Sequence, residues 1–358
     1  MLFSRFIPLT TKKKLVAGQF SSRAPSNIAL IKYWGKYGIQ LPKNASLSFS
    51  LSQCSTQTTL AYTPHQHSTI DFEVFFEKRS APEFKPKIET FFKRVLPYAP
   101  YLKDYHFTIH TTNTFPHSSG IASSASGMAA LSLCVLQMEK ALYPEMTTDY
   151  FYKKASFLAR LGSGSAARSI SGPVMIWGKH PRIKGSCEEL AIANPFQMHP
   201  FFENYQDTIL IVDKGQKKVS STLGHDLMNN HPFAQRRFEQ AAVNILELIH
   251  FLTTGDAEGF IELVESEALT LHAMMMTSRP YYLLMKPQTL QIIEAIWDYR
   301  QTTGQSLCFT LDAGANVHLL YPKSERKKTM AFIKDHLSTY CQHGAYICDQ
   351  VGKGAVLL

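Results

Sequence analysis

Residues 116–127 read PHSSGIASSASG. This stretch of small and hydroxyl side chains lies between a strand-like run at 105–111 and a run of strong helical character at 128–142. Small side chains let backbone N–H groups approach a ligand, and a helix N-terminus carries partial positive charge, so the stretch favours an anion-binding loop. Its spacing matches neither the GxxxxGK[ST] phosphate loop nor the GxGxxG dinucleotide turn. Taken alone, it is equally consistent with a serine-rich helix cap.

The composition indicates a folded, water-soluble protein. Of the 358 residues, 45% are hydrophobic and 18% are charged, which fits two domains or one large α/β unit. No apolar run reaches the roughly 18 residues that a membrane helix needs. An apolar segment precedes Lys12–Lys14, which is the reverse of the order in a secretory signal. The six cysteines include no CxxC pair, so we expect reduced thiols, a cytoplasmic location and no membrane partner.

The net charge of +9 raises the question of a polyanionic partner. Proteins that bind nucleic acid usually cluster their basic residues. Here the lysines and arginines are dispersed, with short runs only at 12–14, 217–218 and 326–328. The basic runs are therefore interpreted as solvated surface segments, and the charge gives only weak support for nucleic-acid binding. Histidines show neither HExxH nor Cys/His ligand spacing, and metal binding by histidine is not expected.

The hydrophobic periodicity predicts two α+β halves. In the first half the expected strands are 55–63, 70–76 and 105–111, and the expected helices are 85–95, 128–142 and 148–161. In the second half the expected strands are 208–212, 307–311, 317–321 and 345–348, and the expected helices are 232–253, 257–275, 287–302 and 323–337. We place the domain boundary near residues 190–205, which gives domains at 1–195 and 196–358.

Three further motifs carry chemistry. Residues 26–36 read SNIALIKYWGK and place two lysines near a glycine turn. Residues 160–169 read RLGSGSAARS and combine hydroxyls with Arg168, whose guanidinium suits a carboxylate or another oxyanion. Residues 310–316 read TLDAGAN and place Asp312 beside a glycine turn, where loops commonly present reactive carboxylates.

Together, in this order, the motifs resemble the GHMP kinase superfamily, and most closely its diphosphomevalonate decarboxylase family. The resemblance rests on NIALIKYWGK at 27–36, FPHSSGIASSASG at 115–127, GSGSAARSISG at 162–172 and FTLDAGANVH at 309–318, and it spans residues 24–352. It implies a two-domain fold with an N-terminal half like domain 2 of ribosomal protein S5 and a ferredoxin-like C-terminal half. It also implies ATP-dependent decarboxylation of 5-diphosphomevalonate to isopentenyl diphosphate through 3-O-phosphorylation, in the mevalonate route to isoprenoids.

The resemblance assigns roles by position. Asp312, Lys32 and Arg168 match the catalytic residues, with Arg168 holding the substrate carboxylate. The matching substrate-binding residues are Asn27, Tyr33, Lys36, Ser163, Gly164, Ser165 and Arg168. The matching residues for ATP and Mg²⁺ are Ser118, Ser119, Gly120, Ala122, Ser123 and Ser124, with either Ser123 or Ser124 as the metal ligand. A homodimer is the assembly implied.

Two departures from the family pattern leave the substrate open. Residues 37–42 replace a longer loop, and residues 223–231 replace a segment that holds a diphosphate-binding arginine in some relatives. The sequence offers three possible substitutes for this arginine: Arg236, Arg237 or Lys218. A related enzyme acting on 5-phosphomevalonate, or a mevalonate-type kinase without decarboxylation, is the alternative. A nucleic-acid-binding module, suggested by the S5-like half, is the alternative from another class.

Overall fold

The structure is a computed structural model that describes residues 3–8, 13–65, 70–117, 121–215 and 221–358. The expected nucleotide-binding residues Ser118, Ser119 and Gly120 lie outside the described residues, as does Lys218. All the other expected site residues are described.

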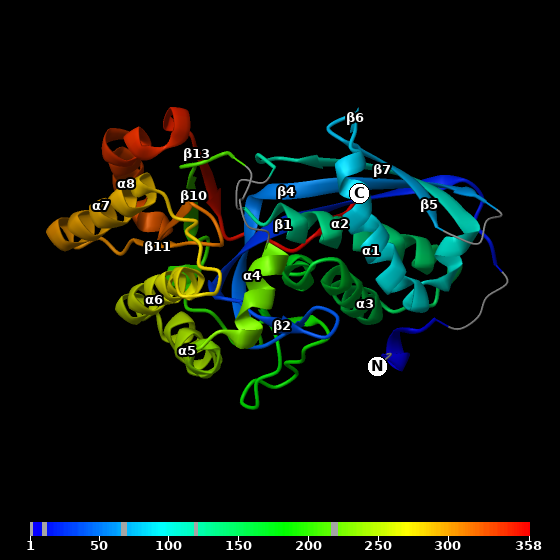
Figure 1. The fold of residues 1–358 in the computed structure, drawn as a ribbon, viewed down its shortest axis with the longest axis horizontal. Coiled ribbons are helices and arrows are strands. Elements are labelled where there is room, and N and C mark those ends of the chain that lie inside the picture. Colours follow the sequence, from blue (N-terminus) through cyan, green and yellow to red (C-terminus); the bar gives the residue numbers. More distant parts are fainter. Residues whose placement is uncertain (1–2, 9–12, 66–69, 118–120, 216–220) are drawn as a thin grey trace.

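The first half of the chain builds most of an eight-stranded sheet, to which the end of the chain adds one strand (Figure 1). Its main path runs β14 (Val356–Leu357), β1 (Gly18–Ile31), β4 (Ser46–Pro64), β7 (Tyr105–Asn113), β5 (Asp71–Phe76) and β6 (Arg79–Ser80). Off this path, β4 also pairs with β8 (Val174–Trp177), which pairs with β9 (Ala191–Ala193). Neighbouring strands are antiparallel except β5 and β7, which are parallel. A separate hairpin joins β2 (Lys36–Tyr37) to β3 (Leu41–Pro42).

Three helices cover one face of this sheet (Figure 1). They are α1 (Lys85–Val95), α2 (Ser123–Leu142) and α3 (Thr148–Gly162). Most of α2 is buried, because it packs against β1 and β4 on one side and α3 on the other. Burial of its apolar and small residues therefore fixes the point where α2 begins, directly after the serine-rich loop.

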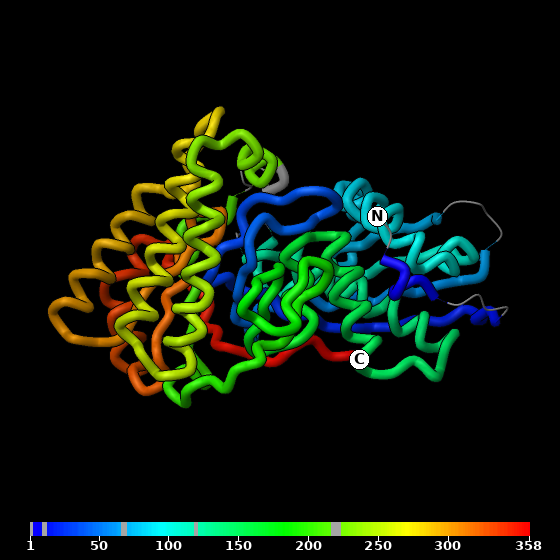
Figure 2. The backbone as a smooth tube through the Cα atoms, turned by 90° about the horizontal axis from the view of Figure 1, so that it is seen from below, coloured from blue at the N-terminus to red at the C-terminus, as the bar shows by residue number. Residues whose placement is uncertain are grey.

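The second half forms a four-stranded antiparallel sheet with its own helices (Figures 1 and 2). The strand order is β11 (Cys308–Thr310), β12 (Val317–Tyr321), β10 (Gln206–Leu210) and β13 (Tyr346–Gln350). The helices are α4 (Ser221–Leu227), α5 (Ala234–Thr254), α6 (Ala257–Met276), α7 (Pro287–Thr303) and α8 (Arg326–Phe332). The helices α5 and α7 each end at a glycine with positive φ, Gly255 and Gly304, as helix C-termini commonly do.

A shared core and a carboxylate join the two halves. Leu47 and Phe49 of β4 pack in one cluster with Ile209 of β10 and Phe260 of α6. The Asp349 carboxylate on β13 accepts hydrogen bonds from the backbone N–H groups of residues 52, 53 and 54 in β4. These contacts hold the two sheets in a fixed relation, so residues from both halves can build one site.

The prediction of a two-domain α+β fold is confirmed. The predicted helices 85–95, 148–161, 257–275 and 287–302 agree with α1, α3, α6 and α7 to within one residue at each end. The helix predicted at 323–337 is helical over its whole length, but only α8 is an α-helix, because a 3₁₀ turn precedes it and a wider π turn follows it at Ile333–Leu337. The short elements β8, β9, α4 and β14 were not predicted. The last of these returns to pair with β1, so the chain's end belongs to the first sheet.

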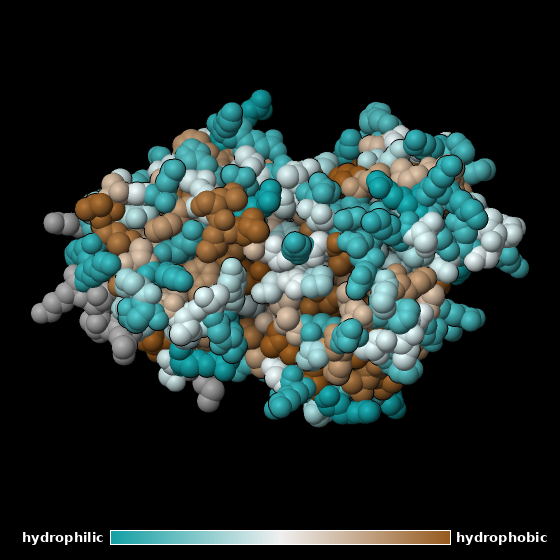
Figure 3. Space-filling model, turned by 180° about the vertical axis from the view of Figure 1, so that it is seen from behind, coloured by the Kyte–Doolittle hydropathy of each residue, from teal (hydrophilic) through white to brown (hydrophobic). Residues whose placement is uncertain are grey.

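The surface contains both hydrophilic and hydrophobic residues. Figure 3 shows hydrophilic and hydrophobic residues interspersed over one face, with several apolar groups near its middle. Scattered exposed apolar residues are ordinary for folded proteins. Within the described residues, no helix is both long and apolar enough to cross a membrane.

Candidate active site

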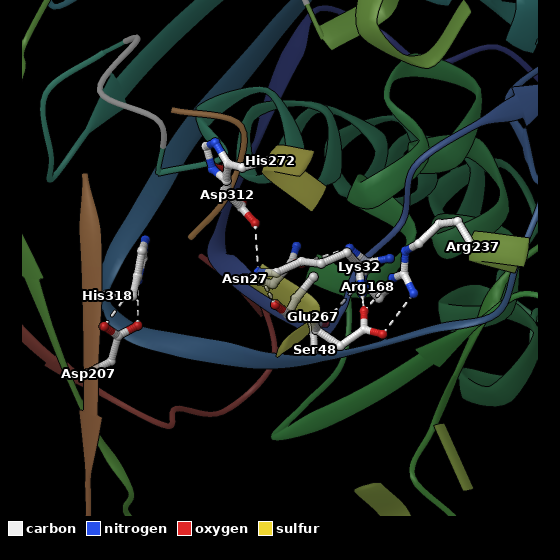
Figure 4. Close-up of polar contacts among 11 residues, drawn as sticks. Asn27, Lys32, Ser48, Arg168, Asp207, Arg237, Glu267, His272, Asp312 and His318 are labelled. Carbon is white, nitrogen blue, oxygen red and sulfur yellow. Dashed lines mark hydrogen bonds and ion pairs between the residues drawn. The ribbon is translucent and has the colours of Figure 1, made fainter. Parts of the chain in front are cut away.

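Lys32 and Asp312 meet where the two halves join (Figure 4). Lys32 follows β1, Asp312 follows β11, and their Nζ and Oδ1 atoms lie 3.4 Å apart. Lys32 is 2% exposed and Asp312 is 26% exposed. Desolvation lowers the pKa of Lys32, and the nearby carboxylates of Asp312 and Glu267 oppose that shift. The pair therefore combines a buried amine with a carboxylate that solvent or a substrate can reach.

Arg168 is held next to this pair by hydroxyl and amide groups. Its Nε donates to Ser48 Oγ at 3.1 Å, its Nη1 donates to Ser46 Oγ at 2.5 Å, and its Nη2 lies 3.4 Å from Asn27 Oδ1. Burial lowers the pKa of Arg168 to about 10, while the charge of Asp312 favours the protonated form. Because the guanidinium stays charged at neutral pH and its described partners are neutral groups, it is suited to an anionic ligand.

Asn27 fixes the neighbouring loop. Its Nδ2 donates to Ser169 Oγ at 2.7 Å and to the Ser165 carbonyl at 3.3 Å. Its Oδ1 faces Arg168. Asn27, expected to bind substrate, therefore also sets the position of the Ser163–Arg168 turn relative to β1.

The backbone of Lys32 is anchored by a buried ion pair. The Lys32 N–H donates to Glu267 Oε2 at 2.8 Å, and Arg237 Nη1 donates to Glu267 Oε1 at 2.9 Å. A second contact joins Arg237 Nη2 to Glu267 Oε2, and Asn244 donates to Oε1 at 2.6 Å. The prediction that Arg237 replaces the diphosphate-binding arginine is wrong, because the Arg237 guanidinium is buried and bound to Glu267. Arg236 is 88% exposed and pairs with Glu239.

Replacing Arg237 with alanine is expected to destabilise the fold by about 3–5 kcal/mol, because it leaves the Glu267 charge buried without its partner. Chemical denaturation followed by circular dichroism measures this loss. Arg236→Ala is the matched control, since it removes an adjacent arginine whose ion pair is solvated. Equal stability of the two variants would contradict the assigned role of Arg237.

The described part of the serine-rich loop is held from both sides. Ser26 Oγ donates to the Ile121 carbonyl at 2.6 Å, and Ser126 Oγ lies 2.6 Å from Thr56 Oγ1. Ala122 precedes α2 with φ +46°, a conformation that residues other than glycine seldom adopt and that clusters at functional sites. Ser123 and Ser124 open the helix, and Ser124 Oγ lies 3.2 Å from Ser163 Oγ. The loop at the start of α2 and the turn that carries Arg168 are therefore direct neighbours.

Tyr33 packs against the glycine of that turn. Its ring lies edge-on to Trp177 with centroids 4.7 Å apart. A Cβ atom on Gly164 would lie 2.8 Å from the Tyr33 hydroxyl oxygen, so glycine is required here. The hydroxyl is buried and has no hydrogen-bond partner among the residues that the structure describes. Burial raises the pKa of Tyr33, which keeps the hydroxyl protonated as a donor.

A second lysine faces Lys36 from α1. Lys36 is half-buried, and burial lowers its pKa against the opposing charge of Asp226. Lys87 meets solvent, yet the surrounding protein lowers its pKa to about 8 through desolvation, helped by repulsion from Lys36. Their like charges repel, which disfavours the protonated form of Lys87.

A separate buried pair stands beside the loop of Asp312 (Figure 4). His318 Nδ1 lies 2.8 Å from Asp207 Oδ2, and both side chains are 3% exposed. Desolvation raises the pKa of Asp207, and His318 opposes the shift. The contact joins β10 to β12, and His318 of β12 pairs in register with Thr310 of β11, the strand that precedes Asp312.

A hollow elsewhere among the described residues does not suit an anionic substrate. One of about 490 Å³ is lined by the acidic residues Glu258, Glu262 and Glu265 of α6, and Glu265 is already bound to Arg300. Among the residues with described positions, no group of three His, Cys, Asp or Glu side chains is placed to hold a metal ion.

Some residues of the site were not identified from the sequence. Ser46 and Ser48, which hold Arg168, alternate along β4 in the run SLSFSLS. Alternate residues of a strand share one face, so three buried serines at that spacing were the available signal. Glu267 gave no comparable signal, because its partners Lys32 and Arg237 are distant in sequence.

The comparisons with known proteins agree across the chain. The diphosphomevalonate decarboxylase-like N-terminal domain matches residues 24–188, and the mevalonate 5-diphosphate decarboxylase C-terminal domain matches residues 208–353. The diphosphomevalonate decarboxylase of Aspergillus fumigatus is 28% identical over 88% of this chain and 79% of its own length. That of Saccharomyces cerevisiae is 27% identical over 87% of this chain and 80% of its own length.

Solved structures show the same similarity. The mevalonate diphosphate decarboxylase of Staphylococcus aureus has a TM-score of 0.81 at 28% identity, covering 96% of this chain and 98% of the other. MDDEF in complex with MVAPP, AMPPCP and magnesium has a TM-score of 0.80 at 28% identity, covering 96% and 99%. With both family domains matched in order and the motif residues gathered at the junction of the halves, this chain belongs to the diphosphomevalonate decarboxylase family.

Proposed function

We propose that this protein converts 5-diphosphomevalonate, with ATP, into isopentenyl diphosphate, ADP, phosphate and carbon dioxide. The observation that carries the proposal is the convergence of Asp312, Lys32 and Arg168 at the junction of the halves, next to the start of α2. Membership of the family and the bound ligands of MDDEF support the choice of substrates.

In the first step the 3-hydroxyl oxygen of the substrate attacks the γ-phosphorus of ATP, and the bond from that phosphorus to the ADP oxygen breaks. Asp312 orients the hydroxyl and accepts its proton. A tertiary alcohol is a poor acid, so alignment for in-line transfer contributes more than proton removal. Lys32, 3.4 Å from Asp312, stabilises the carboxylate and the charge on the transferring group.

In the second step the C3–O bond breaks and inorganic phosphate leaves. The electron pair of the bond to the carboxyl carbon becomes the new carbon–carbon double bond, and carbon dioxide is released. Arg168 positions the carboxylate. Arg168 is itself held by the neutral side chains of Ser46, Ser48 and Asn27. The clamp must orient the carboxylate without overstabilising it, because negative charge moves away from that group in the transition state.

The start of α2 fits the phosphates of ATP. Its first-turn N–H groups and the hydroxyls of Ser123 and Ser124 are donors that suit phosphate oxygens, and the first turn contains no acidic residue. Mg²⁺, which prefers oxygen ligands including phosphates and water, would be held there by Ser123 or Ser124 with the nucleotide. When bound, the ion neutralises charge on the phosphates. Tyr33, Lys36, Ser163, Gly164 and Ser165 would hold the substrate's diphosphate.

Turnover measured on mevalonate, its 5-phosphate and its 5-diphosphate, each with MgATP, tests the proposal. We expect ADP, phosphate and carbon dioxide in equal amounts from the 5-diphosphate, with much lower turnover of the other two. Formation of ADP and a stable phosphate ester without carbon dioxide would instead support a kinase. Preferred turnover of the 5-phosphate would move the specificity to that substrate.

We extend the proposal to a cytoplasmic homodimer, which the family resemblance implies. Light scattering after size-exclusion chromatography measures the mass in solution. A mass near twice the 40.4 kDa of the chain supports the dimer, and a monomeric mass across the working concentration range contradicts it.

A further inference from the structure

His225 of α4 contacts three consecutive residues of the substrate loop, Tyr33, Trp34 and Gly35. The Gly35 N–H donates to His225 Nδ1 at 2.9 Å. The His225 ring lies with its centroid 4.3 Å from that of Tyr33 and 4.7 Å from that of Trp34. The contact reaches from the second half of the chain to the loop that carries Lys32 and Lys36.

The packing around this contact is close. A Cβ atom on Gly224 would lie 2.6 Å from the Trp34 ring, so only glycine lets α4 approach so nearly. His225 itself is 8% exposed. The position of α4 against the substrate loop is thus set by a glycine, tilted ring contacts and one hydrogen bond.

The hydrogen bond fixes the tautomer of His225. Because Nδ1 accepts a hydrogen bond from the Gly35 N–H, the neutral ring carries its own proton on Nε2. Burial and the charges of Lys36 and Arg168 lower the pKa of His225 to about 3, so the ring is neutral at working pH. In the described part of the chain, that Nε2–H has no acceptor.

Two other buried histidines provide a contrast. His180 accepts from the Arg182 N–H at Nδ1 and lies 3.0 Å from the Ala242 carbonyl through Nε2. His231 accepts from the Phe233 N–H at Nδ1 and lies 3.0 Å from the Met274 carbonyl through Nε2. Both use both ring nitrogens within the protein, as a structural histidine should. His225 uses one.

The neighbouring donor is also unsatisfied. Within the described residues, the Tyr33 hydroxyl is buried without a hydrogen-bond partner, and its ring packs at a tilt against His225. Leaving a buried donor such as this hydroxyl unpaired is costly. The hydroxyl and His225 lie beside Lys36 and the turn that carries Ser163 and Gly164. Unpaired donors next to a cation indicate an anionic oxygen acceptor.

We propose that His225 is a binding residue for the phosphoryl group at the 5-position of the substrate, donating from Nε2 beside the Tyr33 hydroxyl while its Nδ1 positions the loop through Gly35. The inference rests on the proposed function, since the acceptor is a phosphoryl oxygen of that substrate. The neutral donors of His225 and Tyr33 would then bind the phosphoryl group together with Lys36. Arg237 is not available for this, because its guanidinium is bound to Glu267.

Three replacements of His225 separate its contributions. His225→Phe keeps an aromatic ring but removes both hydrogen bonds. His225→Gln keeps an acceptor and a donor but removes the ring. His225→Leu, a smaller apolar side chain, provides the same loss of hydrogen bonds if the phenylalanine variant does not fold.

Steady-state kinetics on the 5-diphosphate, with ATP saturating, are the measurement. We expect His225→Phe or His225→Leu to raise KM for the 5-diphosphate by about tenfold to a hundredfold, because hydrogen bonds to a charged group are lost. The KM for ATP should change little. His225→Gln should restore KM to within about threefold of the wild-type value, since both polar contacts can re-form.

The control is His231→Ala, which removes a histidine that is 7% exposed from the segment after α4. It should lower the unfolding temperature without changing KM for the 5-diphosphate. An unchanged KM in folded His225→Phe and His225→Leu, or equal KM increases in the phenylalanine and glutamine variants, would overturn the inference. Failure of the wild-type protein to turn over the 5-diphosphate would instead refute the proposed function.

Discussion

Replacing Asp312 with alanine is expected to lower kcat by about 10²–10⁴-fold, the usual effect of removing a positioned acid–base group. Part of the loss comes from Lys32. That amine is 2% exposed and lies 3.4 Å from the Asp312 carboxylate, so losing the carboxylate removes a charge that keeps its pKa up. The substitution therefore removes the proton acceptor and also favours a neutral Lys32. Steady-state assays of carbon dioxide release measure the effect.

The fold should survive this substitution. His272 Nε2 contacts the backbone carbonyl of residue 312 at 3.1 Å, and alanine keeps that carbonyl. Asp213→Ala is the matched control, because Asp213 is 40% exposed and its carboxylate contacts Lys286 at 3.6 Å in the same half. Both variants should unfold at nearly the same temperature, and only Asp312→Ala should lose activity. Near-normal turnover of Asp312→Ala would remove this residue from the mechanism.

The residues that the sequence identified correctly as neighbours come from short, local patterns. Asn27, Lys32, Arg168 and Asp312 each lie in a motif with a characteristic arrangement of small residues, and the structure brings these side chains together. Their common location followed from the family resemblance. Periodicity alone could not predict it, because Lys32 and Asp312 are 280 positions apart in the chain.

The residues that support the site were harder to predict. Ser46 and Ser48 act only because β4 pairs with β8 beside the Arg168 turn. Glu267 is a buried acid in a helix, and its role depends on two partners from separate elements. Such contacts are set by packing between elements, which no local spacing encodes. Arg237 illustrates the same limit. The sequence made it a candidate for binding the diphosphate, and only its contact with Glu267 in the structure excludes it.

The unpredicted elements have a related physical origin. The helix α4 spans seven residues that include Gly224, too short and too polar for a clear periodic pattern. It is stabilised by its contact with Trp34 and Gly35 rather than by intrinsic propensity. The strands β8 and β9 have four and three residues, and they form because β4 offers an open edge.

Replacing Arg168 with alanine is expected to lower kcat for carbon dioxide release by about 10²–10³-fold, because a misplaced carboxylate loses the alignment that the clamp supplies. Arg168→Lys should recover only a small part of this loss. A lysine presents one ammonium group and cannot contact Ser46, Ser48 and Asn27 together while facing the substrate. The KM for ATP should stay near the wild-type value, since Ser123 and Ser124 are unchanged.

Arg300→Ala is the control for loss of a partly buried arginine. Its guanidinium is 26% exposed and contacts Glu265 at 2.7 Å, at a distance from the proposed substrate, so its removal should cost stability and leave kcat unchanged. Assaying ADP and carbon dioxide in parallel distinguishes the two steps. If ADP formation persists while carbon dioxide release fails, Arg168 acts mainly in the second step. An effect of Arg168→Ala confined to the KM for ATP would contradict the carboxylate clamp, because a group held by Asn27 and two serines of β4 would then serve the nucleotide instead.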